Sequence, residues 1–319
     1  MRNTMLVVTV TAFGLAASLD AQLNLPSPAA FAPTPALDVP GSRLPVEKER
    51  RYVMSGAVRP LLFWIGRDDI GIGRIVWRRS DDGARGYELL VGTDPARAPR
   101  GINRWGFVSE EASGGGGSLL ALMTGSHETS YEEEAEAAAD GASGGEFRTI
   151  WSRMSGGATA WHVSQVRSRE ALTVHQVAEA LDYLESRGGR TASRRRAVAR
   201  DVRSGFLVAV ADLLDATVAA SHAGPSRAPQ KAVQYIFGEQ TYELLVRDVD
   251  PVVVTWSGRK TPAVKVSFQT RGLSTGNRSR FELTAGTAGD TAGVPMTIEW
   301  QPRWWLKVRL RLEDPHRVP

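Results

Sequence analysis

The C-terminal segment Val294–Asp314 reads VPMTIEWQPRWWLKVRLRLED, and its apolar residues alternate with polar ones. In Leu306–Leu312 every second residue is Leu or Val, and the residues between them are Lys or Arg. Because successive side chains of an extended strand point to opposite faces, this pattern predicts a strand with one apolar and one cationic face. Val294–Trp300 alternates in the same way. With Gln301-Pro302-Arg303 as the connection, the two runs predict an antiparallel hairpin with one buried face.

Similar short apolar runs fill two other parts of the chain. Between residues 51 and 166 they are rich in Trp, Ile, Val and Phe, and they return after Lys231. Asp82-Gly83 lies between two of these runs and is typical of a tight hairpin turn, because such turns require a positive φ. The short spacing of the runs predicts antiparallel pairing, because parallel strands would need a helix between each pair. The acidic, alanine-rich insert Tyr131–Gly145 in the first region is either a loop or one short surface helix.

Two segments between these regions have helical periodicity. Thr173–Ser186 begins with a good N-cap residue and has apolar residues at helical spacing. Ser204–Ala220 is apolar nearly all round, which is typical of a buried helix. We therefore expect the second helix to cover a sheet or to pack between the two β regions. The arginine-rich stretch Arg187–Arg203 between the helices is interpreted as a linker rather than as a phosphate- or membrane-binding segment.

These patterns divide the chain into five parts. Residues 1–21 are predicted to be a signal peptide, 22–50 a Pro/Ala-rich tether and 51–170 an N-terminal antiparallel β domain. Residues 171–225 form a helical connector, and 230–315 form a C-terminal antiparallel β domain. The predicted fold class is mainly β with two helices, in which two curved antiparallel sheets or half-barrels are joined by a helical segment.

The first 21 residues indicate in which cellular compartment the protein acts. Arg2 supplies a positive charge, Met5–Ala17 is an apolar run, and small residues follow up to Ala21. This order is typical of a secretory signal, and the apolar run is shorter than the roughly 20 residues of a membrane span. We therefore expect a periplasmic or secreted protein with no transmembrane span after cleavage.

Composition and motifs give no catalytic site. The 319 residues include no cysteine, which excludes disulfides, thiolate nucleophiles and thiolate metal sites. The formal net charge of +4 is small for this length, so we expect no nucleic-acid partner. The five histidines form no pair with metal-ligand spacing, and no Gly-x-Ser-x-Gly motif occurs. The sequence thus predicts no catalytic, cofactor-binding or metal residues and no cofactor.

Tryptophans next to arginines are the candidate ligand contacts. An indole beside a guanidinium can lie against an apolar ligand, or it can stack with the guanidinium and close the mouth of a barrel. Trp304 and Trp305 must point to opposite faces if both are extended, so one of them should be partly exposed. The candidates, all near predicted strand starts, are Asn103, Arg104, Trp105, Arg303, Trp304 and Trp305.

The C-terminal third also resembles a known family. The residues that carry the resemblance are Thr261-Pro262-Ala263-Val264-Lys265-Val266, Arg280–Leu283, Gly293–Ile298 and Leu306–Leu312. Their order resembles that in a family of bacterial periplasmic β-rich proteins with only an uncharacterised-domain label. The resemblance implies a strongly curved antiparallel sheet and supplies no catalytic residues.

Three functions fit these observations. The first is a non-enzymatic cell-envelope protein that binds a lipid or another apolar or amphipathic ligand inside a curved sheet. The second is a hydrolase whose site is assembled from Glu110, Asp68, Asp69 or His162, which would have to meet in one cleft. The third is a structural or partner-binding envelope component with an exposed strand edge or apolar patch; its protein partner is unknown.

Overall fold

The computed structural model describes most of the chain after the N-terminal segment. The described residues are 44–59, 64–113, 116–125, 146–155, 157–167, 172–186, 190–198, 202, 205–222, 232–238, 240–303 and 306–314. The predicted signal peptide, the tether up to residue 43, Trp304 and Trp305 lie outside them.

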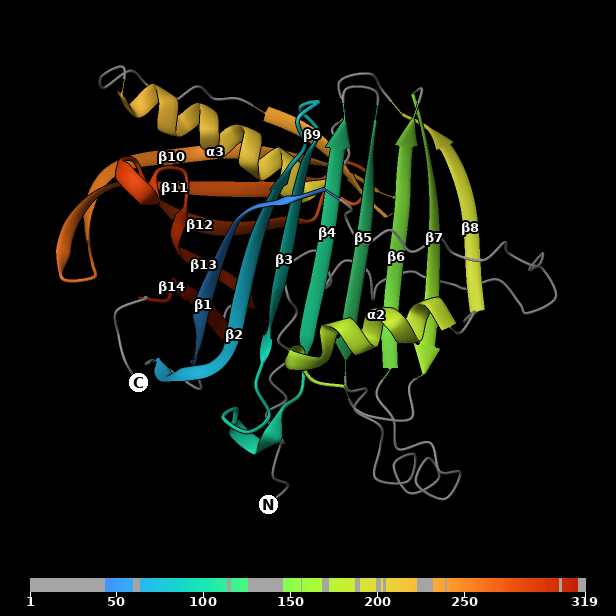
Figure 1. Ribbon diagram of the computed structural model, residues 1–319, viewed down its shortest axis with the longest axis horizontal. Helices are drawn as coiled ribbons and strands as arrows, with labels where there is room; N and C mark the ends of the chain where they lie inside the picture. Colours follow the sequence, from blue (N-terminus) through green and yellow to red (C-terminus); the bar gives the residue numbers. More distant parts are fainter. Residues whose placement is uncertain are drawn as a thin grey trace.

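The described residues form one antiparallel sheet of fourteen strands (Figure 1). The strands on the N-terminal side of the helices are β1 (Val46–Val58), β2 (Ile65–Arg79), β3 (Arg85–Thr93), β4 (Trp105–Ser113), β5 (Gly116–Gly125), β6 (Glu146–Ser155) and β7 (Ala158–Arg167). The remaining strands are β8 (Arg190–Ala197), β9 (Ala232–Phe237), β10 (Gln240–Trp256), β11 (Arg259–Gly272), β12 (Arg278–Gly286), β13 (Pro295–Arg303) and β14 (Leu306–Leu312).

The first and last strands pair in the middle of the sheet. The strand order runs from β8 through β7 to β1, continues with β14, and then runs down to β9, so the sheet is open between β8 and β9. Residues 52–58 of β1 pair with residues 306–312 of β14 in antiparallel register. Tyr52 adds a second connection, because its hydroxyl donates a 2.8 Å hydrogen bond to the carbonyl of Pro295 in β13. The N-terminal and C-terminal β regions are therefore continuous halves of one sheet.

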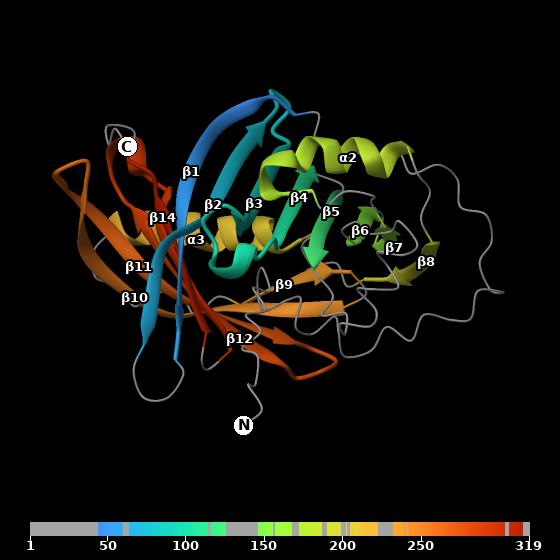
Figure 2. The ribbon, with the colours of Figure 1, turned by 90° about the horizontal axis from the view of Figure 1, so that it is seen from below.

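The sheet curves around one helix and carries another on its outside. Helix α3 (Phe206–His222) lies between the two arms of the sheet, and α2 (Val177–Ser186) lies against the outer side of β3–β5 (Figure 2). We call the side facing α3 the inner face. Buried residues of α3 pack there in the main core with alternate residues of the strands, including Tyr52, Leu283 and Leu310. A smaller core, which includes Phe107 and Ala180, lies under α2.

Period-two alternation explains why the sheet has two such different faces. In β14 the four residues Leu306, Val308, Leu310 and Leu312 are all buried on the inner face. On the outer face Lys307 and Arg309 both pair with Glu299 of β13 at 2.7 Å. An extended strand places neighbours on opposite sides, so the same seven residues build the core and a charged surface.

The mainly β fold class with two helices is confirmed, and three local predictions are corrected. The connection of the last hairpin is not residues 301–303, because β13 continues to Arg303 with a register shift after Trp300. Part of the predicted arginine-rich linker is strand β8, which pairs with β7 along Arg190–Ala197. Strand β1 begins at Val46, inside the predicted tether. In each case residues that lack apolar alternation are in a strand because they pair with a neighbouring strand.

Candidate functional site

An apolar cavity lies between α3 and the inner face of the sheet. Its volume is about 240 Å³. Its apolar lining comes from three places: Ile75, Trp77, Tyr87 and Leu89 of β2 and β3, Leu207, Val210 and Leu214 of α3, and Leu283 and Ile298 of β12 and β13. We call this space the inner cavity. Small-molecule sites are usually lined mainly by apolar side chains with a few polar groups, and they are somewhat larger, at roughly 300–1,000 Å³.

An aromatic cluster limits the size of the inner cavity. Phe206, at the first turn of α3, packs against Tyr235 and Phe281 with ring centroids 5.5 and 5.6 Å away. Tyr235 in turn stacks on Tyr242, and Phe281 stacks on Phe268. These rings fill the space between α3 and strands β9–β12. The cavity is therefore confined to the side of α3 that faces β2, β3, β12 and β13.

Charged side chains surround the mouth of the inner cavity. Arg85 at the start of β3 forms a 2.9 Å ion pair with Asp212 of α3. Arg79 at the end of β2 pairs with Glu47 of β1 at 3.2 Å, with both side chains largely exposed. Lys48 of β1 lies over the ring of Trp77, with Nζ 5.8 Å from the ring centroid. The cavity therefore combines apolar walls with charged side chains at its mouth.

A buried carboxylate fixes the start of α3 over the sheet. Glu110 of β4 is completely buried, and its Oε2 accepts a 2.9 Å hydrogen bond from the backbone N–H of Val208. Gly205 lies so close that a Cβ there would be 2.4 Å from the Glu110 carboxyl carbon. Burial raises the pKa of Glu110 to about 7, and the N–H groups of the first helical turn oppose that rise. Glu110 thus acts as an internal cap for the helix that covers the cavity.

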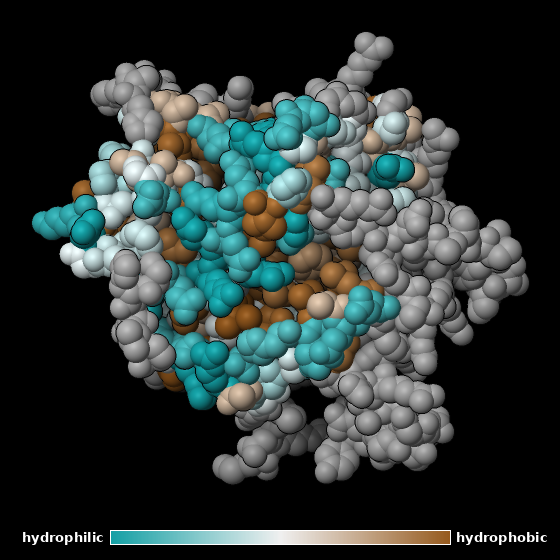
Figure 3. Space-filling model, in the orientation of Figure 1, coloured by the Kyte–Doolittle hydropathy of each residue, from teal (hydrophilic) through white to brown (hydrophobic). Residues whose placement is uncertain are grey.

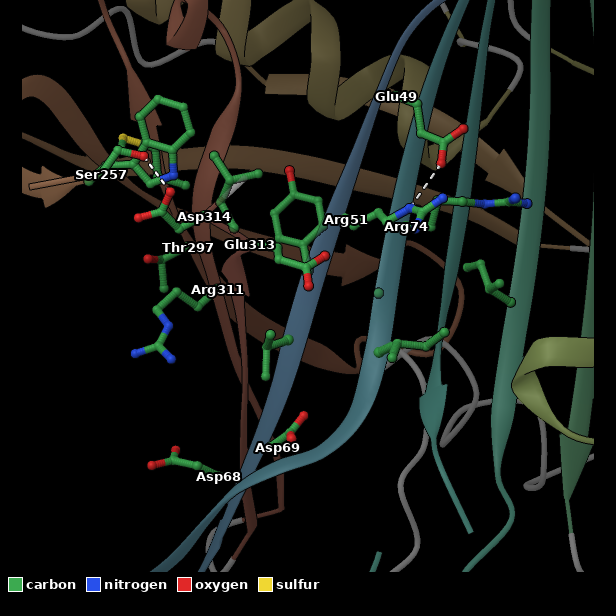
Figure 4. A pocket seen from close by; sticks show the side chains of 18 of the residues that line it. Glu49, Arg51, Asp68, Asp69, Arg74, Ser257, Thr297, Arg311, Glu313 and Asp314 are labelled. Atoms are coloured by element: carbon green, nitrogen blue, oxygen red, sulfur yellow. Dashed lines mark hydrogen bonds and ion pairs between the residues drawn. The ribbon is translucent and has the colours of Figure 1, made fainter. Parts of the chain in front are cut away.

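A second, wider depression lies on the outer face. We call it the outer groove; its volume is about 1,280 Å³, and its lining includes Arg51, Arg74 and Arg311 on neighbouring strands. Hydrophilic side chains border the depression, and apolar ones lie at its floor (Figure 3). Arg51 contacts Glu49 at 3.5 Å, and Ser257 donates a 2.5 Å hydrogen bond to Asp314 at the opposite side (Figure 4). The outer groove therefore differs from the inner cavity in being much wider and in having several exposed charged side chains along it.

The three described carboxylates of the predicted hydrolase site do not meet. Asp68 and Asp69 line the outer groove and are both exposed, and Asp69 is paired with Arg97 at 2.6 Å. Glu110 lies on the inner face under α3, on the other side of the sheet. The side chain of His162 lies outside the described residues. The geometry therefore gives Glu110 a structural role and keeps it apart from Asp68 and Asp69.

The predicted ligand-contact residues take structural positions where they are described. Trp105 is buried at the start of β4, and its indole N–H donates a 2.9 Å hydrogen bond to the carbonyl of Leu172. The side-chain amide of Asn103 donates to the same carbonyl at 3.0 Å, and Arg104 between them is also buried. Asn103 and Trp105 thus hold the segment before α2, and none of the three residues lines the inner cavity or the outer groove. The side chain of Arg303 and all of Trp304 and Trp305 lie outside the described residues.

Sequence reasoning did not identify Lys48, Trp77 and Tyr87 as cavity residues. Trp77 and Tyr87 read as ordinary core residues of two strands, and Lys48 fell in the predicted tether. One signal did point to the site. The segment that became α3 is apolar on nearly all sides, which indicated a helix covering a sheet.

The described residues lack two other features that would point to a function. No three His, Asp or Glu side chains in this part of the chain come together in a way that would hold a metal ion. No helix within the same residues is both long enough and apolar enough to span a bilayer.

Comparisons with known proteins leave the function open. No protein-family model matches this chain, and no curated protein matches its sequence. One solved structure from Brucella abortus, described as a beta-barrel-like protein of domain of unknown function DUF1849, is similar over 83% of this chain and 96% of its own. The TM-score is 0.34 and the sequence identity is 8%. The family resemblance of the C-terminal third therefore stays a prediction.

Proposed function

We propose that this protein binds a single-chain amphiphile, with the apolar chain in the inner cavity and the polar head at its mouth. The observation that carries the proposal is the apolar-lined space between α3 and the sheet, beside the core side chains that pack on the same face. Its volume suits one short chain better than the two chains of a bilayer lipid.

The test is a series of straight-chain alcohols from hexanol to decanol, with binding measured by isothermal titration calorimetry. Each buried methylene contributes about 0.8 kcal/mol, which corresponds to roughly fourfold in affinity. We expect affinity to rise by about that factor per carbon and to level off once the chain fills the cavity. A rise that continues without a plateau, or no binding at any length, would contradict the proposal.

A matched pair of variants on α3 locates the binding. Val210→Phe adds a ring at a position that lines the inner cavity, whereas Ala219→Phe adds the same ring at an exposed position of the same helix. We expect Val210→Phe to weaken decanol binding at least tenfold and Ala219→Phe to change it less than twofold. Circular dichroism of both variants verifies that the fold is kept. Equal effects of the two substitutions would place the ligand elsewhere.

We further propose that the protein acts in the cell envelope after export. The support is the order of charged, apolar and small residues in Met1–Ala21. Fractionation of cells that express the full chain, followed by N-terminal sequencing, tests this directly. We expect a periplasmic product that begins after Ala17 or Ala21; a cytoplasmic product that keeps Met1 would refute export.

A further inference from the structure

The charges at the mouth of the inner cavity are not evenly balanced. On the α3 side, Arg85 is paired with Asp212, and Asp215 lies near enough to interact with both Arg85 and Arg79. Arg79 is also paired with Glu47. The cations that belong to β2 and β3 are therefore compensated by carboxylates of α3 and β1.

Lys48 on the β1 side has no such partner. Within the described residues it makes no ion pair and no side-chain hydrogen bond, and its contact is with the face of Trp77. Arg50 follows on the same face of β1, since Lys48 and Arg50 pair with Trp77 and Ile75 of β2, and its charge disfavours the ammonium. Burial is the main cause that lowers the pKa of Lys48, and the charge of Arg50 adds to it.

The acidic groups near Lys48 compensate it only in part. Glu47 is already paired with Arg79, and Asp290, in the short helix before β13, is exposed and makes no ion pair with Lys48 among the described residues. A half-buried cation at the edge of an apolar space, with a second cation beside it, is complementary to an anion. The Trp77 ring beneath the ammonium belongs to the cavity wall, so an anion there would adjoin a chain inside the cavity.

From this arrangement we infer that the amphiphile has an anionic head, such as a carboxylate, which the Lys48 ammonium binds at the mouth of the inner cavity. The inference rests on the proposed function, since it assigns the head group of a ligand whose chain occupies that cavity. Trp77 contributes in two ways: its ring forms part of the apolar wall, and it holds the Lys48 side chain over the mouth.

The test compares decanoate with decanol, two probes with the same chain length and different heads. Binding of both is measured by calorimetry at pH 8 to the wild type, Lys48→Gln and Lys260→Gln. Lys260 is an exposed lysine of β11 near the β10–β11 turn, and it lines neither depression. We expect Lys48→Gln to reduce the preference for decanoate over decanol roughly tenfold, as for the loss of one charge-assisted hydrogen bond. Lys260→Gln should leave that preference within twofold of the wild type.

The outcomes separate the inference from the function on which it rests. Suppose that both probes bind and Val210→Phe weakens the binding of both, but Lys48→Gln leaves the preference for decanoate unchanged. The inference of an anionic head group is then wrong, whereas the proposed binding in the cavity still stands. The same holds if Lys48→Gln weakens both probes equally. If neither probe binds, or Val210→Phe affects neither, the cavity proposal itself is wrong and the inference falls with it.

Discussion

At the scale of single residues, Glu110 shows how one buried group can serve the fold and also limit its stability. Its carboxylate accepts a hydrogen bond from a backbone N–H of α3, yet its other oxygen has no hydrogen-bond partner among the described residues. The hydroxyl of the buried Tyr235, which interacts electrostatically with Glu110, also has no partner within that part of the chain. Buried polar groups without partners cost free energy, so this cluster makes the core under α3 sensitive to protonation.

The direction of the pH dependence follows from the pKa of Glu110. It is about 7 in the folded protein, above the ordinary value of 4.5, so the folded state binds the proton more tightly than the unfolded state. The stabilisation that this proton provides is present below pH 4.5 and is lost as pH rises to about 7. Over that window the loss amounts to about 3 kcal/mol, at roughly 1.4 kcal/mol per pKa unit.

Glu110→Gln tests this dependence, because the amide keeps the shape of the protonated acid and does not ionise. We expect the wild type to lose on the order of 3 kcal/mol of unfolding free energy relative to Glu110→Gln between pH 4.5 and pH 8. Urea denaturation at a series of pH values measures the difference. Glu313→Gln, which removes an exposed carboxyl after β14, is the matched control and should follow the wild type. Parallel pH curves for wild type and Glu110→Gln would contradict the argument.

At the scale of elements, α3 owes its position to contacts that its own sequence does not contain. Its apolar surface indicated burial, but its place depends on Glu110, which lies about a hundred residues earlier on β4. Gly205 is needed before the helix because any larger residue would meet that carboxylate. The predicted N-cap of the other helical segment is a local feature: the backbone N–H of Thr173 donates a 3.1 Å hydrogen bond to the side chain of Gln176.

The sequence predicted strands correctly where apolar and polar residues alternate. It did not predict a strand that lacks this alternation and forms only by pairing with its neighbour. The Asp82-Gly83 turn was predicted from residue type, and it joins β2 to β3 with Gly83 at φ +85°. Strand β8, in contrast, contains Arg190 and three consecutive arginines, and only its pairing with β7 makes it a strand. Positive charge on an edge strand also opposes pairing with another chain, which gives this arginine-rich segment a structural reason.

At the scale of the whole molecule, the β1–β14 pair decides how the two halves of the sheet behave. Leu310 of β14 is completely buried and contacts the region of Tyr52 and Gly73. The predicted division into two β domains would allow each half to unfold separately, whereas a continuous core favours one transition.

Leu310→Ala distinguishes these possibilities. We expect it to lower the unfolding free energy by roughly 2–5 kcal/mol, as for a buried leucine truncated to alanine. Because the sheet is continuous, hydrogen exchange should accelerate together in β3–β4 and in β11–β12. Val253→Ala, at a side chain that is 67% exposed, is the control and should change neither the unfolding free energy nor the hydrogen-exchange rates. Faster exchange confined to the C-terminal strands would show that the halves are independent.

The sequence by itself determined the local structure: the antiparallel strands, the two helices and the two-faced strand Leu306–Leu312. Alternation and helical periodicity are properties of neighbouring residues, so they can be read without the fold. Only the tertiary structure decided that the first and last strands pair, that α3 lies inside the curved sheet, and that Lys48, Trp77 and Val210 surround one cavity. These residues are distant in the chain, and their contact depends on the order and curvature of fourteen strands, which no local pattern encodes.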